Sequence, residues 1–271
     1  MHDQGDLTRR FDFLALYTVL YLGFIYLPVF VIPLFSFNDS LYVAFPLKGF
    51  TLQWYDNLIN DSPGLFAALG NSIKVAGVVA VISTGFGLLA AKAVTRYRMP
   101  GKGVMVSFIM TPLVIPGIVI GIALLVLLNN AGVKLSLFSV GIGHMLVCVP
   151  FSMVVLISRL EGFDKGFEEA AQDLGERPWG VFWRVTFPLA LPGIIASVLL
   201  TFTISFDEFI LAFFLAGSDA TLPVYIWSQL RFPNRLPSVL ALGSLILLAS
   251  FVIVVFAEWF RRRGGGTANS V

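Results

Sequence analysis

The sequence predicts an all-α integral membrane protein with six transmembrane helices. Of its 271 residues, 57% are hydrophobic and only 13% are charged, and the mean hydropathy of +0.87 is far above that of soluble domains. Crossing the hydrocarbon core takes about 20 apolar residues. The long apolar runs lack the alternation of strands, so we expect helices, which satisfy every backbone group within the span. The six expected spans are Phe13–Phe35, Leu69–Ala91, Val104–Leu128, Phe138–Ser158, Ala190–Leu215 and Val239–Phe260.

The first expected span follows a short polar segment, residues 1–12. Its apolar run is too long for the core of a signal peptide, and no small-residue cleavage site follows it, so we interpret it as a retained helix. Residues 36–68 form the longest loop on the outer side and are rich in aromatic and turn residues. We expect them to form a short, partly helical cap at the membrane interface.

The second expected span contains Gly85-x-Gly87-x-x-Ala90, which is similar to a dinucleotide-binding fingerprint. Because the string lies inside an apolar span and not between a strand and a soluble helix, we interpret it as a helix-packing feature. The short basic loop that follows is expected to turn at Pro100-Gly101.

The third expected span must be bent or locally open, because Pro112 and Pro116 remove backbone hydrogen bonds. A bend at Pro116 suits either a kinked packing helix or a segment that lines a pathway through the membrane. The Gly117-x-x-x-Gly121 spacing also permits close helix approach. In the fourth expected span, Cys148 is interpreted as a small packing residue and His144 as a hydrogen-bonded interior residue. The single cysteine excludes a disulfide or a cysteine metal site within the chain.

The polar loop between the fourth and fifth expected spans, residues 159–189, is predicted to hold two short helices separated by a hinge at Gly175. Good helix formers end at Gly175, and Pro178 can open a second helix. The small residues Ala170 and Ala171 would let the first helix enter a groove on a partner. Charge for basic groups in that groove would come from three acidic residues, Glu168, Glu169 and Asp173.

Two carboxylates, Asp207 and Glu208, lie in the fifth expected span, and they are the acidic residues deepest in any span. An ionisable side chain there costs about 2.5–3.5 kcal/mol on insertion scales. They are therefore expected to face water or a cation, or to pair with a basic residue of a partner subunit. Adjacent helical residues point about 100° apart, so one of the two is expected to face the pathway. Aromatic faces nearby, Phe206 among them, could contact a cation.

Orientation follows from the basic residues, most of which fall on one side of the six spans. By the positive-inside rule this side is cytoplasmic, which places both termini inside. Residues 13–260 would then form one six-helix membrane domain, and residues 261–271 a flexible cytoplasmic tail. The cytoplasmic set is Arg9, Arg10, Lys92, Arg96, Arg98, Lys102, Arg159, Lys165, Arg177, Arg184 and Arg261 to Arg263; the outer set is Lys48, Lys134, Arg231 and Arg235.

The cytoplasmic loop carries a spaced motif: Glu169-Ala170-Ala171, three residues, Gly175, nine residues, then Val185-Thr186-Phe187-Pro188. This motif resembles the signature of ABC-importer permeases, although Val185 and Phe187 replace the family's usual Ile and Leu. Further segments are similar to the spermidine/putrescine-type permeases, and together they run from the second span to the loop before the sixth. These segments are Asn71-Ser72-Ile73-Lys74, Arg96-Tyr97-Arg98, Ser205-Phe206-Asp207-Glu208-Phe209 and Thr221-Leu222-Pro223-Val224-Tyr225-Ile226-Trp227-Ser228.

The resemblance implies a type I importer permease fold in a bacterial inner membrane. It also implies a heterodimer with a second permease, two ATPase subunits docked on the cytoplasmic loop, and an external binding protein that the outer loop could contact. The sequence has no G-x-x-x-x-G-K-[ST] phosphate-binding loop, so we expect a non-enzymatic subunit with ATP and Mg²⁺ on the partner ATPase. Neither a metal nor a nucleic acid is expected as a ligand, and lipid surrounds the spans.

The expected activity is import of a small cation, a polyamine such as putrescine or spermidine, by alternating access. Related permeases carry opines, organic amines or ferric ions, and the sequence leaves these open. An ion-driven secondary transporter using Asp207 or Glu208 is a rival of another class, as is an assembly or sensor protein that shares the fold.

Overall fold

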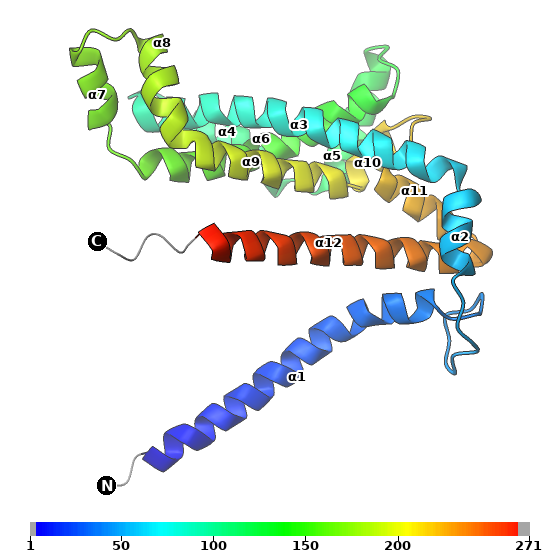
Figure 1. Cartoon of the computed structure of the whole chain (residues 1–271). Helices are drawn as coiled ribbons and strands as arrows, with labels where there is room; N and C mark the ends of the chain where they lie inside the picture. Colours follow the sequence, from blue (N-terminus) through cyan, green and yellow to red (C-terminus); the bar gives the residue numbers. More distant parts are fainter. Residues whose placement is uncertain (1–3, 265–271) are drawn as a thin grey trace. The chain divides into compact units, whose positions relative to one another are not determined.

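The computed structural model describes the backbone of residues 4–264 (Figure 1). Residues 1–3 and 265–271, which include most of the expected tail, lie outside the described residues. Within the described chain, five helices are long and apolar enough to cross a membrane, or six if one bent helix pair counts as a single span. The expected all-helical membrane fold is confirmed. The chain divides into two compact units, residues 64–225 and residues 1–63 with 226–271.

The terminal unit consists of α1 (Gln4–Ser36), α2 (Gln53–Asn60), a short 3₁₀ turn (Pro233–Arg235) and α12 (Leu236–Gly264), with α12 packed against both α1 and α2. The expected partly helical cap is confirmed by α2. Trp54 of α2 donates from its indole nitrogen to the carbonyl oxygen of Asn38 at 2.9 Å. The guanidinium of Arg235 donates to the carbonyl oxygen of Asp61 at 3.1 Å, which ties the start of α12 to the end of the cap.

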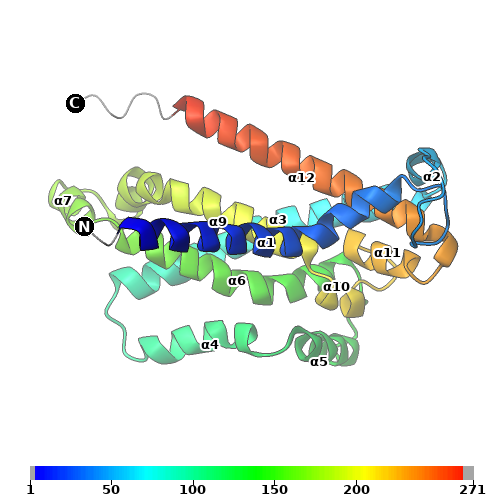
Figure 2. The ribbon, with the colours of Figure 1, turned by 90° about the horizontal axis from the view of Figure 1, so that it is seen from below.

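The central unit runs from α3 (Pro63–Arg96) to the first half of α11 (Leu222–Gln229). Its long helices are α3, α6 (Leu137–Glu161) and α9 (Phe187–Asp207), and α6 packs along α9. Shorter helices complete it: α4 (Lys102–Val114), α5 (Gly117–Asn130), α7 (Gly166–Asp173), α8 (Pro178–Val181) and α10 (Ile210–Leu215). Figure 2 shows α4 and α5 along one side of α6. The apolar core lies where α5, α6 and α10 meet, around Leu124, Val140 and Leu211.

Small polar side chains join the three long helices of the central unit. The hydroxyl of Ser197 on α9 donates to Ser152 of α6 at 2.7 Å and lies 3.1 Å from the hydroxyl of Thr84 on α3. Nearer the other end of α9, Ser205 lies 2.8 Å from Nδ1 of the buried His144. Hydrogen-bonded hydroxyls between close-packed helices are typical of membrane proteins, where no hydrophobic effect holds helices together.

The third span is bent much more sharply than a simple helix kink. The helix axis changes direction by 101° between α4 and α5, with a break between Val114 and Gly117. The expected bend is thereby confirmed, as is the close approach at Gly121, where an added Cβ would lie 2.8 Å from the ring of Phe214. Gly101, at the expected turn before α4, has a φ of 75°, which favours glycine.

The fifth span differs from the expectation of one helix over residues 190–215. The helical stretch begins earlier, at Pro178, and ends at Asp207, and α10 is a separate short helix. Glu208 is extended, with φ −70° and ψ 111°, which stops α9. Its side chain accepts hydrogen bonds from the first backbone N–H groups of α10, so the polar residue stabilises a break where an apolar one would allow the helix to continue.

Gly87 is the packing glycine of the string in the second span. A Cβ at this position would lie 2.6 Å from Cβ of Ser152 and 2.9 Å from the backbone nitrogen of Met153, so α3 and α6 approach closely there. Gly85, two residues earlier, has no neighbour within 4 Å of such a Cβ. The packing interpretation of this string is confirmed.

Replacing Gly87 by alanine should therefore lower stability while Gly85→Ala should not. Overpacking a tight helix contact costs about 1–3 kcal/mol, whereas Gly→Ala in an open helical position gains up to about 1 kcal/mol. The thermal unfolding midpoint of each purified variant in the same detergent gives the comparison. Equal midpoints for the two variants would show that the α3–α6 contact at Gly87 is not tight.

Candidate functional site

The first part of the candidate site is helix α7 and the turn that ends it. Asp164 accepts a hydrogen bond from the backbone N–H of Gly166 at 3.0 Å, and acidic residues in the first turn suit the positive end of the helix. After α7, Gly175 has a φ of 90°. The N–H of Gly175 donates to the carbonyl oxygen of Gln172 at 2.8 Å, and that of Glu176 to Ala171 at 3.1 Å. This is a Schellman motif, which requires the left-handed residue at the glycine position.

The segment after this turn leads into α9 without interruption. Pro178 stands at the first position of α8, as expected, and a π-helical turn over Phe182–Thr186 follows. Pro188 has no N–H and would crowd the carbonyl of Arg184 in a regular helix, so the wider π turn suits this sequence. Four aromatic rings pack along the joint, those of Trp179, Phe182, Trp183 and Phe187. The predicted break at Gly175 and the new helix start at Pro178 are thus confirmed, but the second helix is not separate, because α8 continues through the π turn into α9. The predicted hinge is in the structure a hydrogen-bonded turn.

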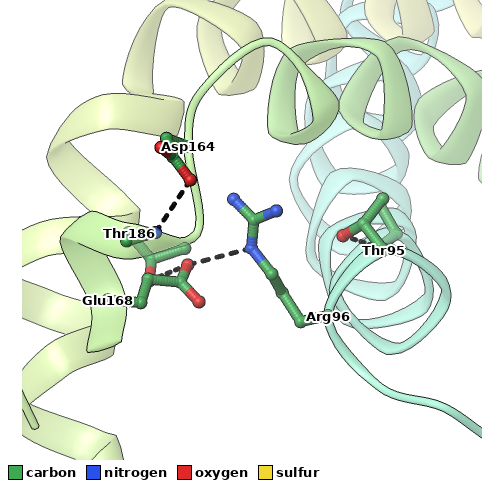
Figure 3. A network of polar contacts seen from close by, with 7 residues as sticks. Thr95, Arg96, Asp164, Glu168 and Thr186 are labelled. Atoms are coloured by element: carbon green, nitrogen blue, oxygen red, sulfur yellow. Dashed lines mark hydrogen bonds and ion pairs between the residues drawn. The ribbon is translucent and has the colours of Figure 1, made fainter.

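A buried ionic network fixes the inner side of α7 (Figure 3). Oε1 of Glu168 accepts a hydrogen bond from Nε of Arg96 at 3.2 Å and another from the hydroxyl of Thr186 at 2.8 Å. The Arg96 side chain is 6% exposed and that of Glu168 is 12% exposed. The guanidinium of Arg96 also lies 4.6 Å from the ring centroid of Phe163, at the end of α6.

The exposed side of α7 carries the rest of the expected docking residues. Glu169, Ala170 and Asp173 are exposed, Ala171 is half-buried, and Glu168 points inward and is not on this surface. Sequence reasoning missed three large apolar side chains in the same loop. Leu174 is 88% exposed, Trp179 71% and Phe167 58%. Large apolar residues inside an otherwise polar loop were a signal that could have identified them.

The second part of the candidate site is the break between α9 and α10. Asp207, the last residue of α9, is exposed. Oε1 of Glu208 accepts from the N–H groups of Ile210 at 2.9 Å and Leu211 at 3.2 Å, so this carboxylate caps α10. Phe206 is half-buried and stacks on Phe202 with ring centroids 5.9 Å apart.

The break in the third span lies beside the break in the fifth. Pro116 is the exposed residue before α5, and a Cβ on the adjacent Gly117 would lie 3.9 Å from Cδ1 of Ile210. The chain thereby brings together the expected pathway residues Pro116, Asp207 and Glu208 in one neighbourhood. The loop around α7 lies at the other end of α9, whose 21 residues span about 30 Å.

An apolar cavity of about 490 Å³ lies between α3, α4 and α6, with Phe86, Phe108, Pro112 and Pro150 in its wall. Its lining contains no charged residue. It therefore lacks the carboxylate that a small cation would need. In the part of the chain that the structure describes, no group of three or more His, Cys, Asp or Glu side chains could hold a metal ion.

Comparisons with known proteins agree with this architecture. The sequence model of the family described as "Binding-protein-dependent transport system inner membrane component" matches residues 83–264. The spermidine/putrescine transport system permease protein PotC of Haemophilus influenzae is 33% identical over 242 residues, which cover 89% of this chain and 93% of the relative. The putrescine transport system permease protein PotI of Escherichia coli is 33% identical over 252 residues, with 89% and 88% covered.

A solved structure shares the fold across the whole length. It is a chain of a bacterial alginate ABC transporter in complex with an alginate pentasaccharide-bound periplasmic protein, with a TM-score of 0.73, 17% identity, and coverage of 99% of this chain and 100% of that chain. At this identity the likeness shows the ABC-importer permease fold alone. With the family match over residues 83–264 and two relatives that align over nearly the full length, the chain belongs to the binding-protein-dependent transport system inner membrane components.

Proposed function

We propose that this chain is the permease subunit of an ATP-driven importer that moves a polyamine, putrescine or spermidine, into the cytoplasm. The observation that carries the proposal is one-third identity, over about nine-tenths of the chain, to permeases named for spermidine and putrescine. The chain itself supplies the membrane pathway. Two ATPase subunits hold ATP and Mg²⁺, a second permease completes the pathway, and a periplasmic binding protein delivers the cargo.

The break after α9 supports a cationic cargo. Asp207 is exposed, whereas one oxygen of Glu208, Oε1, accepts hydrogen bonds from two backbone N–H groups. The last carbonyl groups of α9 point toward the same break, and the C-terminal end of a helix carries a partial negative charge. Asp207 and these carbonyls together favour an ammonium group. We therefore assign the cargo contact to Asp207 and the structural cap to Glu208, with Phe206 and the break at Pro116 beside them.

The surface of α7 supports docking on an ATPase. Ala170 is small and exposed, Glu169 and Asp173 present negative charge, and Leu174 offers an apolar contact at the helix end. A slim acidic helix with an apolar tip fits a groove lined by basic and apolar side chains. Closure of the ATPase dimer then moves α7, and with it the two breaks at the other end of α9. With α7 docked on the ATPase, and with α4 and α5 counted as one span, the alternation of spans would put the loop and both chain termini on the cytoplasmic side.

ATP-driven uptake by the complete complex tests this function. The chain is reconstituted into liposomes with its second permease, its ATPase and its binding protein, and uptake of labelled putrescine and spermidine is measured. We expect uptake that needs both ATP and the ATPase subunit. Uptake driven by a proton gradient without the ATPase would favour a secondary transporter instead. ATP-driven uptake of opines or ferric ions without polyamines would overturn the cargo and leave the permease role in place.

A further inference from the structure

We propose that Arg96 and Glu168 are positioning residues that tie α7 to the end of α3, so that a displacement of α7 moves α3 and α9 together. The inference rests on the proposed docking of α7 on an ATPase. It concerns how a displacement of α7 is passed on to the membrane-spanning helices. It assigns this role to Glu168, the residue directly before the Glu169-Ala170-Ala171 motif.

One oxygen atom joins three segments of the chain. Oε1 of Glu168, on α7, accepts one hydrogen bond from Nε of Arg96 and another from the hydroxyl of Thr186. Arg96 is the last residue of α3, and Thr186 lies in the π turn that leads into α9. A fourth segment joins through Phe163, whose ring lies under the Arg96 guanidinium. The end of α3 makes a second such contact one turn earlier, where Nζ of Lys92 lies 4.6 Å from the ring centroid of Phe182. The last turn of α3 therefore contacts the segments on both sides of α7.

The pair is shielded from water, unlike the other ion pair of the same loop. Glu176 and Arg184 also form an ion pair, but their side chains are 30% and 75% exposed. Salt and water weaken an exposed pair, whereas a buried one keeps its strength. An eight-residue helix is too short to hold itself in place, since isolated helices below about 12–15 residues are marginal in water. The position of α7 thus depends on its contacts, and the buried one is at Glu168.

Arg96 has a donor atom that its contact with Glu168 does not use. Its Nη2 atom is buried and has no hydrogen-bond partner among the described residues. A guanidinium can serve two acceptors at once because its donors lie in a planar fork. Glu168 has a second carboxylate oxygen, Oε2, which would pair with Nη2 if a shift of α7 brought the two together, and the resulting bidentate contact would keep the tie through the movement.

The test measures solute transported per ATP hydrolysed by the complete complex in liposomes. We expect Glu168→Leu and Arg96→Met, neither of which can form the hydrogen bond between these two side chains, each to lower this ratio about tenfold, in the range of ordinary coupling between sites, while ATP is still hydrolysed. Arg96→Lys keeps a positive charge that can reach the single oxygen used here but lacks the planar fork, so its ratio should lie between those of Arg96→Met and the wild type. Glu176→Leu, which removes the exposed pair of the same loop, is the matched control and should leave the ratio unchanged.

The double variant Arg96→Met/Glu168→Leu separates transmission from stability. Each single variant leaves one buried charge without its partner, which destabilises the protein, and the double variant removes that defect. We expect normal amounts of assembled complex from the double variant but a ratio that stays low. If the ratio recovers together with the amount of complex, the pair only stabilises the fold and the proposal is overturned. If the wild-type complex shows no ATP-driven polyamine uptake, the proposed function itself is contradicted. If the wild type transports normally and Glu168→Leu has the same ratio, only the proposed tie is refuted.

Discussion

Replacing Asp207 by asparagine is expected to reduce polyamine uptake by about 10–100-fold, mainly through a higher KM. Hydrogen bonds to charged groups contribute about 1.5–3 kcal/mol, and each 1.4 kcal/mol is a factor of about ten. Asparagine keeps the size of the side chain and removes only the charge. Since Asp207 is exposed at the end of α9, the substitution leaves no buried group unpaired. Initial uptake rates over a range of putrescine concentrations give the KM and the maximal rate.

Glu208→Gln is the matched control, because it removes the same charge one residue further on. A glutamine oxygen can still accept from the N–H groups of Ile210 and Leu211, so the cap on α10 remains. We expect uptake close to that of the wild type. Glu208→Ala removes the cap as well, which typically costs about 1 kcal/mol of stability. Equal losses in Asp207→Asn and Glu208→Gln would show that the two carboxylates share one role and would contradict the assignment of cargo contact to Asp207.

Replacing Gly175 by valine is expected to lower ATP-driven uptake about tenfold, a typical coupling factor. The φ of 90° at this position is strained for a β-branched residue, at a cost of about 1–3 kcal/mol. Relief of the strain breaks the two hydrogen bonds of the Schellman motif and shifts α7 away from its place beside Thr186. Uptake and ATP hydrolysis are measured on the same liposomes, so that a loss of coupling is distinguished from a loss of complex.

Gly175→Asn provides the comparison, since asparagine adopts positive φ more readily than other non-glycine residues. We expect the asparagine variant to keep most of its uptake. If Gly175→Val transported at the wild-type rate with unaltered stimulation of the ATPase, a stiff turn after α7 would not be needed, and the lever mechanism would be wrong.

Much of the fold could be predicted because membrane spans and helix ends leave local signals. The prolines at 112 and 116 predicted the bend in the third span, and the glycine and proline at 175 and 178 predicted where the first helix of the loop ends and the next begins. The break after Asp207 could not be predicted, because the apolar run continues across it to Leu215. A glutamate inside such a run signalled that its carboxylate needs partners, but not that backbone N–H groups would provide them.

Residues for the candidate site could be proposed from the sequence, but which of their side chains are buried and which are exposed could not. Glu168 and Glu169 are identical in type and adjacent in sequence, yet only Glu169 is exposed. The difference arises from Arg96, which is 72 positions away from Glu168 along the chain. Contacts between distant segments depend on the tertiary fold, and a single sequence carries no record of them. In the same way, nothing in the sequence indicated that the hydroxyls of Thr84 on α3 and Ser197 on α9 would lie within hydrogen-bond distance of each other.

The sharp bend between α4 and α5 has a consequence for the lipid around the protein. The two halves have 13 and 14 residues, so they are about 20 Å long each, and neither alone matches a hydrocarbon layer of about 30 Å. Both halves are needed to reach across that layer, and the 101° turn between them makes their combined reach shorter than the roughly 40 Å of an unbroken helix of the same length. A reach below the thickness of the layer is accommodated by local thinning of the surrounding lipid, at a cost of a fraction of a kcal/mol per Å. A bilayer with shorter chains would reduce that cost.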